Sequence, residues 1–142
     1  MSSPQTIVQR DYSQGRAIID VRVAVINQEN HRQVTFSGRR IKIDTGFDAG
    51  FHIRESEMSQ LATIGIRPVV GPVTLAGNMP ATARFCFGYL QKIGDHELPA
   101  PGVEITIVFQ GTNPEGLLGL EAIGNWVVTF NGPSQSFTID RP

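Results

Sequence analysis

One short motif in this sequence combines residue types that acid–base chemistry uses. Asp44, Thr45 and Gly46 directly follow residues 41–43, where two isoleucines flank a lysine in the alternating pattern of a strand. Such a strand delivers a carboxylate to a tight turn, where the threonine hydroxyl can hydrogen-bond the backbone and the glycine lets another chain approach closely. A carboxylate placed there could donate or accept a proton. Taken alone, the tripeptide is more typical of an ordinary Asx-type turn that ends a strand.

The other reactive side chains show no comparable motif. His31, His52 and His96 are scattered and lack the spacing of metal ligands, so we interpret them as solvated or structural and expect no metal and no cofactor. Cys86 lies between two phenylalanines in a strand-like segment, which favours a buried, inert thiol over a nucleophile. The sequence contains no phosphate-cradling loop of the P-loop or dinucleotide-binding type.

The length and composition of the chain narrow the classes of protein to consider. Its 142 residues predict one domain, and its 15 glycines and 9 prolines predict a turn-rich, mostly β structure. The polar residues 1–14 predict a flexible N-terminal arm before a single domain over residues 15–142.

The 12 basic and 13 acidic residues form no basic stripe, which argues against a nucleic-acid partner. The sequence has no apolar run long enough to predict a membrane-spanning helix. A single cysteine excludes an internal disulfide and favours a cytoplasmic location.

The elements that would position the motif are mostly strands. Alternating or β-branched apolar residues predict strands over residues 17–26, 33–36, 39–43, 51–53, 69–75, 81–89, 103–109, 127–130 and 136–139. The turn residues at 76–80 predict the tip of a hairpin. The polar segment 92–102 is interpreted as a loop.

Two short helices complete the predicted secondary structure. The first covers residues 55–64, where Ser56 could act as the cap and Gly65 could end the helix. The second begins after the apolar segment 117–119 and lies near residues 120–124. Neither helix is long enough to change the expectation of an all-β domain.

The order of these features resembles the retropepsin-like aspartic proteases, the retroviral type. In that family an Asp-Thr/Ser-Gly motif follows an apolar strand, a flap hairpin comes next, and an apolar-apolar-Gly segment before a helix supports the active-site loop. The counterparts here are residues 44–46, 76–78 and 117–119. The resemblance covers roughly residues 15–139. It implies a closed or partly open small β-barrel of retropepsin type, with one or two short helices and a flap hairpin.

The resemblance also implies an activity. Members of the family hydrolyse peptide bonds with two aspartates that share one proton across a water molecule. This chain has a single such motif and is too short for two lobes, so Asp44 of a second copy would complete the pair in a C2 homodimer. Thr45 would brace the two motifs across the axis, and Gly46 would contact the substrate backbone.

Five further residues are implied to bind a peptide or protein substrate. Asp48 matches an acidic residue of the family that contacts substrate backbone, and Phe47 would line the pocket. Ala76, Gly77 and Asn78 would form the mobile flap over the cleft.

The sequence departs from the family pattern at three positions. Phe47 stands where the family usually has alanine, and Leu120 and Glu121 stand where arginine and an acidic residue or asparagine are common. We interpret Glu121 as an acid favoured by the N-terminal dipole of the second helix. These departures leave two alternatives open: a catalytically silent retropepsin-like module for dimerisation or peptide binding, and an unrelated β-barrel binding module.

Overall fold

The computed structural model describes residues 5–37 and 40–141, and it confirms the all-β class. Its strands are β1 (Gln5–Asp11), β2 (Ile18–Ile19), β3 (Val21–Ile26), β4 (Gln33–Phe36), β5 (Ile41–Ile43), β6 (Phe51–Ile53), β7 (Val69–Leu75), β8 (Met79–Ile93), β9 (His96–Glu97), β10 (Val103–Phe109), β11 (Gly116–Leu118), β12 (Val127–Asn131) and β13 (Ser136–Arg141). The helical segments are η1 (Glu55–Met58), α1 (Ser59–Ala62), η2 (Ala76–Asn78) and α2 (Leu120–Ile123).

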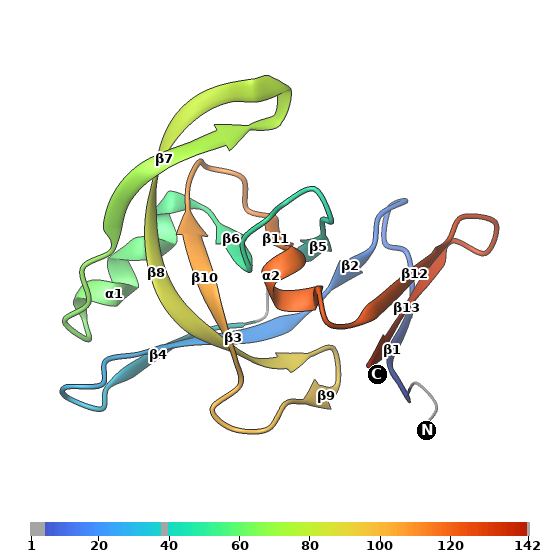
Figure 1. Ribbon diagram of the computed structural model, residues 1–142, viewed down its shortest axis with the longest axis horizontal. Coiled ribbons are helices and arrows are strands. Elements are labelled where there is room, and N and C mark those ends of the chain that lie inside the picture. The colour runs from blue at the N-terminus through green and yellow to red at the C-terminus, as the bar shows by residue number, and fades with distance from the viewer. Residues whose placement is uncertain (1–4, 38–39, 142) are drawn as a thin grey trace.

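These strands form two sheets. The larger sheet has the order β2-β5-β11-β6-β10-β8-β3-β4, and both β7 and β9 also pair with β8. It curls into a partly open barrel (Figure 1). The smaller sheet, β1-β13-β12, projects from this body beside α2 and contains both ends of the described chain (Figure 1).

The core fills the inside of the curled sheet because its strands alternate as their sequences predict. Val21, Val23 and Val25 of β3 are buried, and so are Ile105 and Ile107 of β10. Successive side chains of a strand point to opposite faces of the sheet. The even-numbered residues of β10 therefore face the other side, where the candidate site lies.

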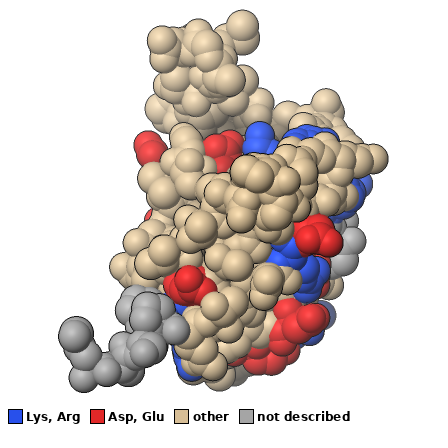
Figure 2. Space-filling view, turned by 90° about the vertical axis from the view of Figure 1, so that its right-hand side faces the viewer, with Lys and Arg blue, Asp and Glu red and all other residues tan. Residues whose placement is uncertain are grey.

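A long hairpin of β7 and β8 arches over that side of the molecule (Figure 1). The strands pair from Val69 with Phe85 to Leu75 with Met79, and the tip is η2. Gly77 at the tip has a φ angle of 76°, a left-handed conformation that glycine adopts without strain. Residues 69–83 contain no charged side chain. Figure 2 accordingly shows an uncharged projection above a body on which charged side chains of both signs are mixed.

Several predicted elements are confirmed with their bounds unchanged, namely β4, β6, β7 and β10. The prediction of a flexible arm over residues 1–14 was wrong for its described part, because Gln5–Asp11 forms β1 and pairs with β13. Val8 and Ile7 explain the difference: Val8 is buried and Ile7 packs against the core, so these two apolar residues hold an otherwise polar strand on the body. Residues 1–4, and Arg39 of the predicted strand 39–43, lie outside the described residues.

Two other expectations need correction. Ser56 does not cap the first helix, because the chain enters η1 at Glu55 and Arg54 occupies the position before it without a side-chain cap. The helix also ends at Ala62, two residues before the predicted Ile64, although Gly65 adopts the expected left-handed conformation with a φ angle of 77°. The loop expected over residues 92–102 is partly strand: β8 continues to Ile93 and pairs with β9. Among the described residues, no helix has the length and apolar character needed to cross a membrane.

Candidate functional site

Asp44 lies in a hydrogen-bonded turn at the end of β5. Its backbone amide donates to the carbonyl oxygen of Leu118 at 2.9 Å, and its Oδ1 accepts from the amide of Gly46 at 2.9 Å. The amide of Phe47 donates back to the Asp44 carbonyl at 3.2 Å, which closes the turn. The half-buried carboxylate is therefore held at a defined position, and the Asx-type turn that the sequence predicts is present.

The turn is supported by a segment more than seventy residues later in the chain. Strand β11 lies between β5 and β6, parallel to the first and antiparallel to the second. Beyond β11, the amide of Gly119 donates to the carbonyl oxygen of Gly50 at 2.9 Å, and the amide of Leu120 donates to that of Phe47 at 2.8 Å. The loop that carries Asp44 is thus bonded to β11 at its start and to the start of α2 at its end.

Glu121 provides a further tie, and this contact was not predicted. It lies in the first turn of α2, as its interpretation as a helix N-terminal acid requires. Its Oε1 also accepts from the backbone amide of Thr106, and its Oε2 accepts from the Thr106 hydroxyl at 3.1 Å. Helix α2 is therefore bonded to β10 through a carboxylate. This bond occurs where retropepsin-like proteases commonly have an arginine followed by an acidic residue or asparagine, in place of Leu120 and Glu121.

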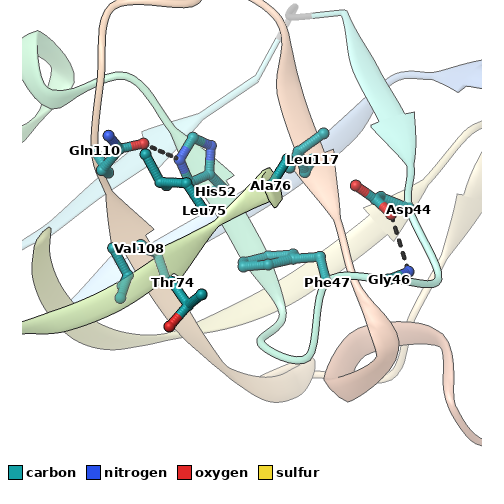
Figure 3. A pocket seen from close by; sticks show the side chains of 11 residues that line it. Asp44, Gly46, Phe47, His52, Thr74, Leu75, Ala76, Val108, Gln110 and Leu117 are labelled. Atoms are coloured by element: carbon teal, nitrogen blue, oxygen red, sulfur yellow. Dashed lines mark hydrogen bonds between the residues drawn. The ribbon is translucent and has the colours of Figure 1, made fainter. Parts of the chain in front are cut away.

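A cavity of about 420 Å³ opens beside Asp44. One wall is the Asp44 turn, a second is the row of facing side chains on β6, β10 and β11, and the third is the arched strand β7 (Figure 3). Its lining residues are Asp44, Gly46, Phe47, His52, Val73, Thr74, Leu75, Ala76, Val108, Gln110 and Leu117. The cavity has room for a side chain of an extended peptide, between the sheet and the hairpin and next to the Asp44 carboxylate.

The structure brings together some of the predicted site residues and not others. Asp44, Gly46, Phe47 and Ala76 line the cavity. Thr45 and Asp48 belong to the same loop as Asp44, but they are exposed and do not line it.

Gly77 and Asn78 lie at the exposed tip of the hairpin, beyond the lining residue Ala76. Asn78 has a φ angle of 58°, so the two central residues of the tip both adopt left-handed conformations. They form the end of the β7–β8 hairpin, which projects beyond the rest of the molecule in Figure 1.

His52 is one of the lining residues that sequence reasoning missed; the others are Val73, Thr74, Leu75, Val108, Gln110 and Leu117. The only signal for His52 was a polar residue at the centre of a three-residue apolar strand, and that pattern does not say what the residue faces. Its Nε2 lies 3.2 Å from Oε1 of Gln110, and its ring meets the ring of Phe47 edge-on at 5.9 Å between centroids. Across residues 5–37 and 40–141, no three His, Cys, Asp or Glu side chains are grouped so that they could hold a metal ion.

Cys86 differs slightly from its prediction. It is half-buried rather than fully buried, and it lies on β8 away from the cavity. Burial of the thiol raises its pKa to about 12, so the thiol is protonated and unreactive near neutral pH.

The whole chain is similar in structure to a retropepsin-like aspartic protease from Rickettsia conorii. Its crystal structure superposes with a TM-score of 0.52, covering 99% of this chain and 97% of that one, at 14% sequence identity. Neither the protein-family models nor the curated proteins contain a match to the sequence. The structural likeness confirms the retropepsin-like fold that residues 44–46 and 117–119 predicted.

Proposed function

We propose that this protein is a homodimeric aspartic endopeptidase in which Asp44 of each copy forms the catalytic pair. The observation that carries the proposal is the position of the Asp44 carboxylate: it is held in a backbone-bonded turn at the wall of a cavity, in a chain with a retropepsin-like fold. Fold alone does not determine activity, and it is the placement of this carboxylate that supports the proposed chemistry.

The chemistry requires two carboxylates that share one proton. Two negative charges so close cannot both persist, so one Asp44 is ionised and the other protonated over a range of pH. The ionised carboxylate takes a proton from water as the water oxygen bonds to the peptide carbon. The protonated one gives its proton to the carbonyl oxygen. In the resulting tetrahedral diol, the carboxyl group that took the water's proton gives it to the nitrogen, and the C–N bond breaks. The other carboxylate takes a proton from a hydroxyl of the diol, which releases an amine and a carboxylic acid and restores the shared proton.

The smaller sheet supports pairing with a second copy. Strands β1 and β13 already pair with each other within the chain, and β1 presents mainly polar side chains at its edge. Strand β12 forms the other edge, where Val127 and Phe130 are 55% and 46% exposed. This strand follows α2, which supports the Asp44 loop. A copy that pairs along β12 would therefore form its contact directly after the helix that supports the Asp44 loop.

The β7–β8 hairpin is the proposed flap. Val73, Leu75 and Ala76 line the cavity from above, and the absence of charge in residues 69–83 suits contact with a peptide backbone and apolar side chains. An extended peptide would lie between this hairpin and the Asp44 turn. Closure of the hairpin would exclude bulk water and add backbone hydrogen bonds to the substrate. The single cysteine suits a reducing, cytoplasmic compartment.

One observation favours a different function. The ring of Phe47 lines the cavity directly beside Asp44, where it takes space that a substrate side chain would need. A catalytically silent dimeric module that binds peptides would tolerate such a ring more easily than an endopeptidase. We keep this as the second candidate function.

Digestion of a peptide library from about pH 3 to about pH 8 separates the two functions. The native protein should cleave with an optimum at mildly acidic pH, because activity needs one protonated and one ionised carboxyl group. Asp44→Asn removes the ionisable group at nearly constant volume and should abolish cleavage while leaving the fold and the dimer intact. Asp95→Asn is the matched control, since the Asp95 side chain is 95% exposed, and it should cleave like the native protein.

A statine-type peptide adds a binding measurement. Its hydroxyl mimics the attacking water between the carboxyl groups, so it should bind the native protein far more tightly than Asp44→Asn. Equal cleavage by native and Asp44→Asn protein would overturn the proposed catalytic role. Binding of ordinary peptides by a native dimer that cleaves nothing at any pH would instead establish the silent module.

A further inference from the structure

A second cavity, of about 360 Å³, lies beside α1 where the β7–β8 hairpin joins the body (Figure 1). It shares no lining residue with the cavity beside Asp44. Met58, Ala62, Ile66 and Pro68 give it apolar walls, and the charged residues that line it within the described chain are Arg67 and Arg84. The cavity therefore combines apolar surface with positive charge of one sign.

Arg84 lies at the junction between the hairpin and the barrel. It pairs with Val70 of β7 and with Phe109 of β10, and directly opposed residues of antiparallel strands present their side chains on the same face of a sheet. Phe109 is fully buried on this face, whereas Val70 is 53% exposed. The half-buried Arg84 thus marks the edge of the core, and Val70 adds an exposed apolar side chain next to it.

The two arginines are not neutralised within the protein. Among the described residues, neither Arg67 nor Arg84 has a side-chain hydrogen bond or an ion pair. The acid nearest to the cavity in the sequence, Glu57, does not line it and is bonded to Arg54 at 3.4 Å and to Gln60 at 2.7 Å. By contrast, ion pairs with carboxylates engage Arg10, Arg16, Arg22 and Arg54. Two positive charges therefore remain available at one cavity.

This combination selects a class of ligand. A carboxylate can accept paired, charge-assisted hydrogen bonds from a guanidinium group. A large apolar side chain beside that carboxylate would fill the space between the apolar walls, as anchor residues of peptide interfaces do. A nucleic acid fits less well, because two arginines do not track a phosphate backbone and the apolar walls would face a charged chain. A basic peptide would be repelled.

We propose that this cavity docks a peptide segment of a partner protein in which an acidic residue lies next to a large apolar residue. The proposal does not depend on the proposed protease activity, because none of the residues that carry it lines the Asp44 cavity. The walls belong partly to α1 and partly to β8. A bound segment would therefore bridge the body and the foot of the hairpin and restrain the movement of the hairpin.

Fluorescence anisotropy tests the proposal with a defined probe. A rhodamine-labelled, C-terminally amidated peptide of sequence Gly-Glu-Leu-Glu-Phe-Gly is titrated into Asp44→Asn protein, so that cleavage does not interfere, at about neutral pH, where its glutamates are ionised. The same peptide with glutamine in place of both glutamates should bind at least about tenfold more weakly. A peptide with serine in place of leucine and phenylalanine should also bind more weakly, because it leaves the apolar walls unfilled. Raising the salt concentration should weaken binding of the original probe.

Variants of the cavity provide the second part of the test. Replacing both arginines, Arg67→Gln with Arg84→Gln, should weaken binding of the probe at least about tenfold. Val70→Asp places a repelling carboxylate at an exposed position beside Arg84 and should act in the same direction, so it keeps the test valid if the double variant does not fold. Arg32→Gln is the matched control and should bind like the parent protein. Arg32 is exposed, and its side chain also has no partner among the described residues, but it does not line the cavity.

Hydrogen exchange locates the bound probe. Slower exchange is expected at residues 58–70 and 82–84, which surround the cavity. The proposal is overturned if the probe does not bind, if the glutamine peptide binds as tightly, or if the arginine and Val70 variants retain the parent affinity. It is also overturned if protection falls at the Asp44 turn instead, or if a short single-stranded oligonucleotide binds as tightly as the probe through the same two arginines.

Discussion

A Cβ atom on Gly119 would lie 2.4 Å from the carbonyl oxygen of Phe47. The same atom would lie 2.3 Å from the carbonyl oxygen of Ala49 and 2.5 Å from Cδ2 of the Phe47 ring, so the obstacle is backbone on two sides as well as a side chain. The approach is this close because Leu120 donates its amide to the Phe47 carbonyl. The glycine of the apolar-apolar-Gly segment is therefore required by the contact that supports the Asp44 loop.

Gly119→Ala should displace that loop. Because the methyl group meets backbone, we expect a loss of about 1–3 kcal/mol in the free energy of unfolding, and a larger relative loss of peptide cleavage than of stability. Urea unfolding followed by circular dichroism measures the first effect. Gly132→Ala is the control, since a Cβ there meets nothing within 4 Å. Equal effects of the two substitutions would contradict the steric explanation.

Phe47→Ala should change both specificity and stability. The half-buried ring lines the cavity and packs on His52, so its removal should admit bulkier substrate side chains and cost about 1–3 kcal/mol of stability. Cleavage profiles of a peptide library and thermal unfolding measure the two effects. Phe87→Ala removes a ring that is 71% exposed, and it should alter neither. An unchanged cleavage profile for Phe47→Ala would show that its ring does not limit the subsites.

The quaternary structure can be tested at the edge of the smaller sheet. The native protein should sediment at twice the 15.5 kDa of one chain. Phe130→Asp places a charge on an exposed apolar position of β12 and should shift the protein to monomers with loss of cleavage. Phe87→Asp makes the same chemical change on β8 and should leave the dimer intact. A native protein that stays monomeric at tens of micromolar would argue strongly against the shared catalytic pair.

The thiol of Cys86 should react slowly and affect stability only at high pH. Its pKa rises from an ordinary 9.0 to about 12 through burial, so near neutral pH a disulfide reagent should label the native protein far more slowly than the unfolded protein. Below the ordinary pKa both states are protonated and stability does not depend on this group. Above it the unfolded thiol ionises first, so the native protein should lose about 2 kcal/mol at about pH 10.5 relative to Cys86→Ala. Rapid labelling of the native protein would contradict the burial argument.

The sequence pattern correctly predicted those elements that are specified by their own residues and not by a distant strand. Strand 103–109 alternates apolar residues with Glu104 and Thr106, strand 69–75 is rich in valine, and both appear with those bounds. The Asp44 turn was predicted for the same reason, because its Asx bond joins residues only two positions apart. The arm expected over residues 1–14 failed because the strand there is specified by β13, at the far end of the chain.

The polar side of the cavity could not be predicted in the same way. His52 was interpreted as solvated or structural, since three histidines without metal spacing carry no local signal. Its place depends on the register of β6 between β10 and β11, which brings it level with Val108 and Leu117. Glu121 is similar, because its bond to Thr106 appears only when α2 lies against β10.

The dependence of the Asp44 loop on Leu118, Gly119 and Leu120 has a consequence for protein synthesis. A ribosome releases the chain from its N-terminus, so the carboxylate emerges long before the segment that holds it in its turn. Until residue 120 has left the exit tunnel, the nascent chain has no bonded loop, no β11 between β5 and β6, and no cavity wall on that side. A chain that is interrupted or cut before that point cannot assemble the site, so it would lack the proposed activity.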